Sequence, residues 1–360
     1  MNIKIHSNEL NQIMKTVSKC INDKMDRFGS IEISHDNNLL TVRGTDGQFS
    51  ACMSTPLLGG DGEKFCVDGV TFGKVCSMCN GEMDIVADEK FCTIKGNGRT
   101  RLPIINADIP AYKSINNGSA TVSVKADDFN SAFSKVEHAI SNDQSRIHLT
   151  GVLIESDGSS LNMTTLDGFR MAIESVHCDG DQLNIIVPGS FMKLIQTGTF
   201  ADDILKISVD KNKIEVVTDG MKISGGLLSG NFPDVSHLIP VDFKTECLVN
   251  SDMVRSALKN SNTLNSKNNL VKAIVEDNKL TIMSNSEIAD YDATIDCETQ
   301  GEGLTIAFNQ KYIIDTINSI DTENVIIKMN NPISPCVITG QTEKGIRKGI
   351  RLVLPVRIAR

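Results

Sequence analysis

The sequence lacks the features of a membrane or secreted protein. No apolar run in its 360 residues approaches the length of a membrane span, and the first ten, MNIKIHSNEL, contain no apolar core of a signal peptide. The ten cysteines show no framework spacing, and a chain of this length does not need disulfides for stability. These absences predict a cytoplasmic protein that does not bind membranes and whose cysteines are mostly buried thiols.

The sequence also lacks the motifs of common catalytic and metal sites. It contains no HExxH, no GxSxG and no GxxxxGK[ST]. Cys76 and Cys79 form a lone CxxC late in a predicted helix, without the second ligand pair of a zinc site or the helix N-terminus that activates a redox thiol. His138 and His148 flank another predicted helix, and nothing pairs them with a nucleophile. We therefore predict no enzyme, no metal site and no cofactor.

Positive charge is in short supply. The chain has 36 lysines and arginines against 45 aspartates and glutamates, a net charge of −9. This balance argues against a protein whose whole surface grips nucleic acid. It remains compatible with one local basic face.

What the sequence does contain is an internal threefold repeat. A short strand followed by an amphipathic helix occurs in IKIHSNELNQIMKTVSKCI, VSVKADDFNSAFSKVEHAI and CLVNSDMVRSALKNSNTL, at intervals of about 120 residues. A second helix recurs in phase in FCVDGVTFGKVCSM, IIVPGSFMKLIQTG and IAFNQKYIIDTINSI, with strand pairs ahead of it. The pattern predicts three copies of one α+β domain, residues 1–118, 119–240 and 241–360, each with two helices backed by antiparallel sheets.

One turn in the second domain raises a functional question. In TTLDGFRMAI, residues 164–173, a predicted strand ends at Asp167 and Gly168, and Phe169, Arg170 and Met171 follow at once. These residues fit a catalytic acid with its partner, the rim of a pocket for another protein's peptide, or a plain turn into a core strand. Because no base, nucleophile or metal cluster converges here, Asp167 is better explained as a turn residue than as a catalyst.

Five segments in register resemble a known family. They are RIHLTGVLIESDGSSLNMTTLDGFRMA, IIVPGSFMKLIQ, GNFPDVSHLIP, FNQKYIIDTINSI and LVLPVRI. Their order and spacing are similar to those of the bacterial DNA polymerase III β sliding clamp, over nearly the whole chain and least well in the first domain. The resemblance implies a DNA-clamp fold in which two three-domain crescents close head to tail as a homodimeric ring. The ring would encircle duplex DNA of any sequence and make the polymerase III holoenzyme processive.

The resemblance also implies a pocket for short linear motifs of the replicative polymerase, the clamp loader and repair proteins. Apolar walls with a few polar groups suit a peptide anchored by leucine or an aromatic residue. The pocket would comprise Leu149, Leu166, Gly168, Phe169, Arg170, Met171, Pro233, His237, Leu238, Leu352 and Leu354. A neighbouring groove would use His148, Asn309, Tyr312, Ile333, Pro335, Pro355, Val356 and Arg357. Phe169, Leu166 and His237 stand where the family often has His, Thr and Arg, which bears on the motif preferred.

Basic residues recur on the polar sides of equivalent helices and are candidates to face DNA. A single helix lysine is equally well explained as part of a solvated face, but recurrence favours the DNA-facing reading. The set is Lys15, Lys19, Lys24, Lys74, Lys135, Arg146, Lys193, Arg255 and Lys259. Ring closure is expected between domain 1, around residues 64–110, and domain 3 of a second copy. A scaffold that kept the clamp fold and its peptide pocket without encircling DNA is the alternative.

Overall fold

The computed structural model describes residues 1–22, 24, 26–36, 38–115, 118–200, 202–263, 269–286, 289–341 and 348–357. One order of elements occurs three times: a strand, a helix, three strands, two further strands, a second helix and a last three strands. The chain is therefore α+β. The first repeat consists of β1 (Asn2–His6), α1 (Ser7–Val17), η1 (Ser18–Cys20), α2 (Asp26–Gly29), β2 (Ser30–Asp36), β3 (Leu39–Thr45), β4 (Phe49–Pro56), β5 (Gly59–Asp61), β6 (Phe65–Asp68), α3 (Gly69–Met78), β7 (Glu82–Ala87), β8 (Phe91–Lys95) and β9 (Arg99–Pro103).

The second and third repeats follow the same order, and in the second the 3-10 helix η3 lies directly before β11, where the first repeat has α2 before β2. The second consists of β10 (Ala120–Lys125), α4 (Ala126–Val136), η2 (Glu137–Ala139), η3 (Gln144–Thr150), β11 (Gly151–Asp157), β12 (Ser160–Leu166), β13 (Arg170–His177), β14 (Asp179–Gly180), β15 (Gln182–Pro188), α5 (Gly189–Gly198), β16 (Ile204–Asp210), β17 (Lys213–Val217) and β18 (Met221–Gly226). A linker containing η4 (Ser236–Leu238) leads to the third: β19 (Thr245–Asn250), α6 (Ser251–Thr263), β20 (Leu270–Glu276), β21 (Lys279–Asn285), β22 (Asp290–Asp296), β23 (Glu298–Gly301), β24 (Leu304–Asn309), α7 (Gln310–Asn318), β25 (Asn324–Met329), β26 (Cys336–Gly340) and β27 (Lys348–Val353).

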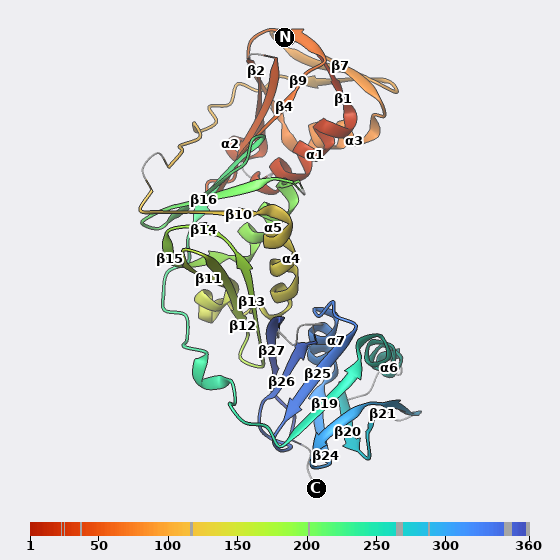
Figure 1. Cartoon of the computed structure of the whole chain (residues 1–360). Coiled ribbons are helices and arrows are strands. Elements are labelled where there is room, and N and C mark those ends of the chain that lie inside the picture. Colours follow the sequence, from red (N-terminus) through yellow and green to blue (C-terminus); the bar gives the residue numbers. More distant parts are fainter. Residues whose placement is uncertain are drawn as a thin grey trace.

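Helices form because their apolar residues recur at helical spacing. In α1 the side chains of Leu10, Ile13, Met14 and Val17 are buried, whereas Lys15 is exposed. The helices α3, α1, α5, α4, α7 and α6 follow one another along one side of the elongated molecule, and most strands lie on the other side (Figure 1). The repeats thus present one continuous helical side.

The sheets run across the boundaries between repeats. The last strand of the second repeat, β18, pairs with β4 of the first, which makes a nine-stranded sheet. In the same way β27 of the third repeat pairs with β13 of the second. The remaining two sheets, β5-β1-β7-β8-β9 and β22-β21-β20-β24, belong to the first and third repeats alone. Within the described part of the chain, β9 and β22 are therefore edge strands at opposite ends of the molecule.

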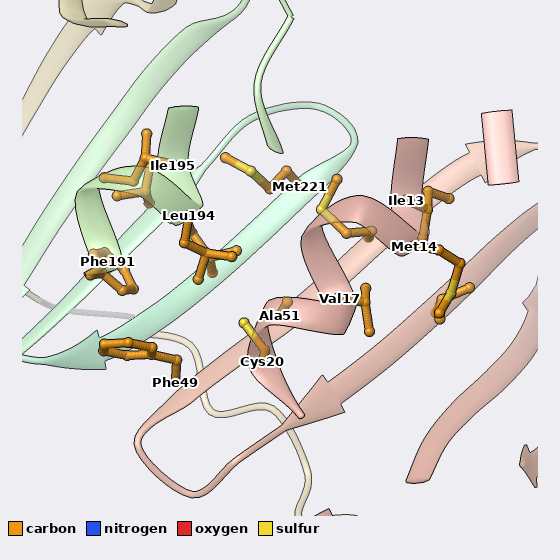
Figure 2. Packing of buried hydrophobic residues seen from close by; sticks show 14 of the residues in the cluster. Ile13, Met14, Val17, Cys20, Phe49, Ala51, Phe191, Leu194, Ile195 and Met221 are labelled. Carbon is orange, nitrogen blue, oxygen red and sulfur yellow. The ribbon is translucent and has the colours of Figure 1, made fainter. Parts of the chain in front are cut away.

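The hydrophobic cores show how firmly the repeats are joined. One cluster continues from the first repeat into the second, where Phe49 contacts Phe191 with ring centroids 5.3 Å apart. Figure 2 shows Met14 and Val17 of α1 on one side of this junction and Leu194 and Met221 on the other. The third repeat has a separate core, and a smaller cluster lies between it and the second repeat. Packing at the first junction is thus continuous, whereas the second junction contains its own apolar cluster.

Candidate peptide-binding pocket and helical face

The turn between β12 and β13 is built by Asp167. Its Oδ1 accepts the backbone N–H of Phe169 at 2.8 Å and of Arg170 at 3.0 Å. Gly168 has φ +95°, a conformation that favours glycine because other residues place a Cβ against the backbone. Asp167 is therefore a turn residue, as the sequence indicated. Its carboxylate is occupied by these contacts.

Arg170, one of the predicted pocket residues, is almost fully buried beside the turn. Its side chain is 7% exposed, and its Nε donates to Asp167 Oδ2 at 3.0 Å. Its Nη1 donates to Asp315 Oδ2 on α7 at 2.7 Å, and the guanidinium lies over the Tyr312 ring, 4.7 Å from the centroid. Arg170 ties the turn of the second repeat to a helix of the third, and its place in the peptide pocket stays a prediction. Arginine suits this role because its planar fork can serve two carboxylates at once.

Asp315, which sequence reasoning missed, completes this network. Burial raises the pKa of its carboxyl, but the hydrogen bonds donated by Arg170 and Lys311 outweigh that effect and leave the pKa below its ordinary value. Lys311 Nζ lies 3.1 Å from the same Oδ2. The sequence offered one signal for Asp315: Lys311 and Asp315 are four residues apart on one predicted helix, a spacing that favours an ion pair. Nothing in the sequence pointed to Arg170 as the third member.

Four of the predicted pocket residues meet in the apolar cluster between the second and third repeats. Met171 lies opposite Leu352 in the β13–β27 pairing, and Leu352 lies opposite Val337 in the β26–β27 hairpin. Phe232, Val235, Ile239 and Phe243 of the linker and the strand residues Ile173 and Ile350 pack against this cluster. It is buried rather than open in the free chain, with Met171 fully covered. Its members are Leu149, Leu166, Met171, Val337 and Leu352. Val337 was not among the predicted pocket residues, although it lies in a strand between Cys336 and Ile338 and points to the opposite face of the sheet.

A second group of apolar side chains remains exposed next to this cluster. Phe169 is 54% exposed and stacks on Tyr312, with centroids 5.6 Å apart and an interplanar angle of 26°. The carbonyl of Phe169 accepts the backbone N–H of Leu354 at 2.8 Å, which brings the carboxyl-terminal segment beside the turn. Ile333, Leu354 and Val356 are exposed as well. Phe169, Tyr312 and Leu354 thus lie close together, and exposed apolar side chains that are gathered in one place are typical of a binding surface.

The other predicted pocket residues have varied surroundings. Asn309 caps α7, where its Oδ1 accepts the N–H of Lys311 and Tyr312. Pro233 lines a cavity of about 750 Å³ between the linker and β15. His237 and Leu238 are exposed on η4, and His237 Nε2 lies 3.4 Å from Asp234 Oδ2. The carboxyl-terminal Arg357 is exposed, whereas His148, Pro335 and Pro355 are half-buried.

The cations that were predicted to face DNA fall into three groups. Four have carboxylate partners: Lys135 with Asp321 at 2.8 Å, Arg146 with Asp143 at 3.0 Å, Lys193 with Glu137 at 3.7 Å, and Arg255 with Asp252. Lys19 donates to Thr197 Oγ1 at 2.6 Å, which joins η1 to α5. In the described residues no carboxylate pairs with Lys15, Lys24, Lys74 or Lys259, and all four are exposed. The field of the helical face is therefore weaker than its number of cations suggests.

Comparison with known proteins identifies the family. The family models "DNA polymerase III beta subunit, central domain" and "DNA polymerase III beta subunit, C-terminal domain" match residues 123–234 and 236–357. The chain belongs to the DNA polymerase III β subunit family. Its curated relatives include the beta sliding clamps of Streptococcus pneumoniae serotype 4, 24% identical over 99% of both chains, and of Haemophilus influenzae, 21% identical over 89% of both.

Solved structures show that the β subunit fold covers all three repeats. The β subunit of Thermotoga maritima superposes with a TM-score of 0.90 at 22% identity, over 99% of this chain and 100% of that one. The sliding clamp of Bacillus subtilis does so with a TM-score of 0.88, over 100% of both chains. The predicted clamp fold is thus confirmed, including the first repeat, whose sequence resembled the family least.

The described residues contain no membrane-spanning helix and no cluster of metal ligands. No helix there is long and apolar enough to cross a membrane. No group of three or more His, Cys, Asp or Glu side chains in those residues could hold a metal ion. All ten cysteines are free thiols, and Cys76 and Cys79 are buried. Burial raises the pKa of the Cys76 thiol, which makes it a poor nucleophile.

Proposed function

We propose that this β subunit is a cytoplasmic sliding clamp without catalytic activity of its own, which closes as a homodimer around duplex DNA. One observation carries the proposal: the two junctions between repeats are made by the same strand pairing, and one strand of each kind, β9 and β22, is left with a free edge at the ends of the molecule. A second copy supplies the missing partner for both β9 and β22. The pairing is head to tail, so two copies close into a ring of six repeats with the helical sides facing inward.

The helical side is suited to contact DNA without holding it in place. Lys15 and Lys259 occupy equivalent positions on α1 and α6 and have no carboxylate partner in the described residues. Because several of the other cations are paired with carboxylates, the helical face is only mildly basic. Weak attraction to phosphates is enough for sequence-independent contact with DNA. Arg255 is less suited to this role, because it also donates to the carbonyl of Ile320 and so supports the end of α7.

The exposed apolar group around Phe169 supports a peptide-binding role for the outer side of the second junction. We propose that it receives short motifs of the replicative polymerase, the clamp loader and repair proteins, with one site in each subunit. Phe169 is 54% exposed, so a peptide that covers it buries roughly half of its side chain, and burying a whole phenylalanine side chain is worth about 1.5–3 kcal/mol. We expect Phe169→Ala to lower the affinity for a glutamine- and leucine-containing clamp peptide by about threefold to tenfold, measured by calorimetry. Unchanged affinity would contradict this location.

The ring itself is tested by mass and by DNA topology. Sedimentation equilibrium should give a dimer of the 39.2 kDa chain. After loading by the cognate clamp loader, the protein should remain on nicked circular DNA at high salt and leave the same DNA once it is linearised. Lys15→Ala with Lys259→Ala should weaken retention, whereas the matched control Lys125→Ala with Lys206→Ala, on exposed strand positions, should not. A dimer that binds the peptide but is never retained on circular DNA would favour the alternative, a clamp-fold scaffold that does not encircle DNA.

A further inference from the structure

The segment that joins the second repeat to the third is held only at its two ends. Residues 229–241, which we call the strap, contain η4 and lie on the side of the molecule away from α4 and α5 (Figure 1). Just before the strap, the N–H of Leu228 donates to the carbonyl of Ile186 at 2.9 Å. Just after it, Asn330 Nδ2 donates to the carbonyl of Asp242 at 2.8 Å. Among the described residues, no hydrogen bond between these two ends joins the strap to a sheet.

The apolar side chains of the strap have two different surroundings. Phe232 and Val235 pack against the apolar cluster that contains Met171 and Leu352. The same two side chains also line the cavity of about 750 Å³ between the strap and the strands β11 and β15. Both are half-buried. They can therefore leave the cluster without losing contact with the protein, because the cavity beside them has room for them.

The backbone at the ends of the strap is suited to act as a pair of hinges. Gly230 has φ +118°, in the region that favours glycine. At the other end, the side chain of Val241 is 92% exposed, so no packing fixes it. Hinges are a few loop residues that absorb a change in φ and ψ. Movement about these two positions displaces the strap and leaves every strand of the sheets paired.

A peptide at the proposed site requires such a movement. Met171 and Leu352 are 0% and 3% exposed, so the anchor of a peptide cannot contact them while the strap stays in place. We propose that the strap is a cover, which a binding peptide displaces into the cavity. The apolar anchor of the peptide then takes the place of Phe232 and Val235 on the cluster. This inference rests on the proposed peptide-binding role and adds the regulation of that site: a closed strap lowers the apparent affinity by the fraction of molecules that are open.

Two substitutions should shift the affinity for the peptide in opposite directions. Phe232→Ala loosens the strap, so a fluorescently labelled glutamine- and leucine-containing clamp peptide should bind about threefold to tenfold more tightly, measured by anisotropy. Asn184→Trp, at an exposed position of β15 that lines the cavity, takes up the space that the strap needs. We expect it to lower the affinity by a similar factor of about threefold to tenfold. Lys206→Trp, at an exposed position of β16, is the matched control and should bind like the parent chain.

Hydrogen exchange distinguishes a cover from a fixed wall of the site. A peptide that displaces the strap leaves the amides of residues 229–239 exchanging at least as fast as in the free chain. A peptide that rests on the strap slows their exchange. The parent sequence contains no tryptophan, so the emission of the one introduced by Asn184→Trp also reports whether that side chain enters the cavity.

The outcomes separate this proposal from the peptide site itself. If Phe232→Ala weakens binding, if neither Phe232→Ala nor Asn184→Trp changes it, or if the peptide protects the strap amides, the strap is not a cover. The peptide site stands in each of these cases as long as Phe169→Ala lowers the affinity. If neither the parent chain nor Phe232→Ala binds the peptide, both proposals fail. Circular dichroism should show that each variant is folded, and Val235→Ala, with the same expected sign, takes the place of Phe232→Ala if that variant unfolds.

Discussion

Replacing Arg170 by Met should loosen the second junction. Methionine keeps an unbranched apolar side chain but removes the contacts to Asp167 and Asp315, whose side chains are 14% and 29% exposed. Breaking a fully buried ion pair costs about 3–5 kcal/mol, and an exposed pair contributes about 0–1 kcal/mol. Because this network lies between the two limits, we expect the free energy of unfolding to fall by about 2–3 kcal/mol.

Urea unfolding followed by circular dichroism measures the loss, and two further variants isolate its cause. Asp315→Asn alone and together with Arg170→Met completes a cycle in which we expect a coupling of about 1–2 kcal/mol. Arg146→Met is the matched control, because Arg146 pairs with Asp143 in the same repeat at a more exposed site. It should cost less than about 0.5 kcal/mol. The role assigned to Arg170 is refuted if Arg170→Met costs no more than this control, or if the cycle shows no coupling.

Three other results are expected. Leu352→Ala should cost about 2–5 kcal/mol in thermal or urea unfolding, because the side chain is 3% exposed; Leu238→Ala, at a site 42% exposed, should cost far less, and equal losses would contradict the cluster. A carboxyl with a lowered folded pKa adds stability above its unfolded pKa and loses it as the pH falls through the folded value. Since the pKa of Asp315 is lowered, Asp315→Asn should flatten the decline of stability below about pH 4, and an unchanged pH profile would refute this. A thiol reagent should react promptly with no more than Cys52 and Cys297, the two half-buried cysteines, and with all ten only after unfolding.

The sequence by itself determined the repeat and its elements. Apolar residues such as Leu10, Phe129 and Val254 recur at helical spacing in three segments, and this spacing depends only on which residues are buried along a helix. The resemblance to the sliding-clamp family singled out Leu149, Met171 and Leu352, and the structure gathers these three side chains in one apolar cluster. The Asp167–Gly168 turn was readable for the same reason. A turn of this kind depends on local conformational preferences, here the side-chain acceptor of Asp167 and the positive φ of Gly168.

Only the tertiary structure decided which charges are free. All three residues carry a positive charge, but Lys15 is exposed, Lys135 is paired with Asp321, and Arg170 is buried. No spacing along the chain distinguishes these cases. The Lys135–Asp321 and Arg170–Asp315 pairs join residues more than a hundred positions apart in the sequence, which only the fold brings together. The free edges β9 and β22 were likewise hidden, because a strand's pattern shows which face is buried and does not show whether its backbone has a neighbour.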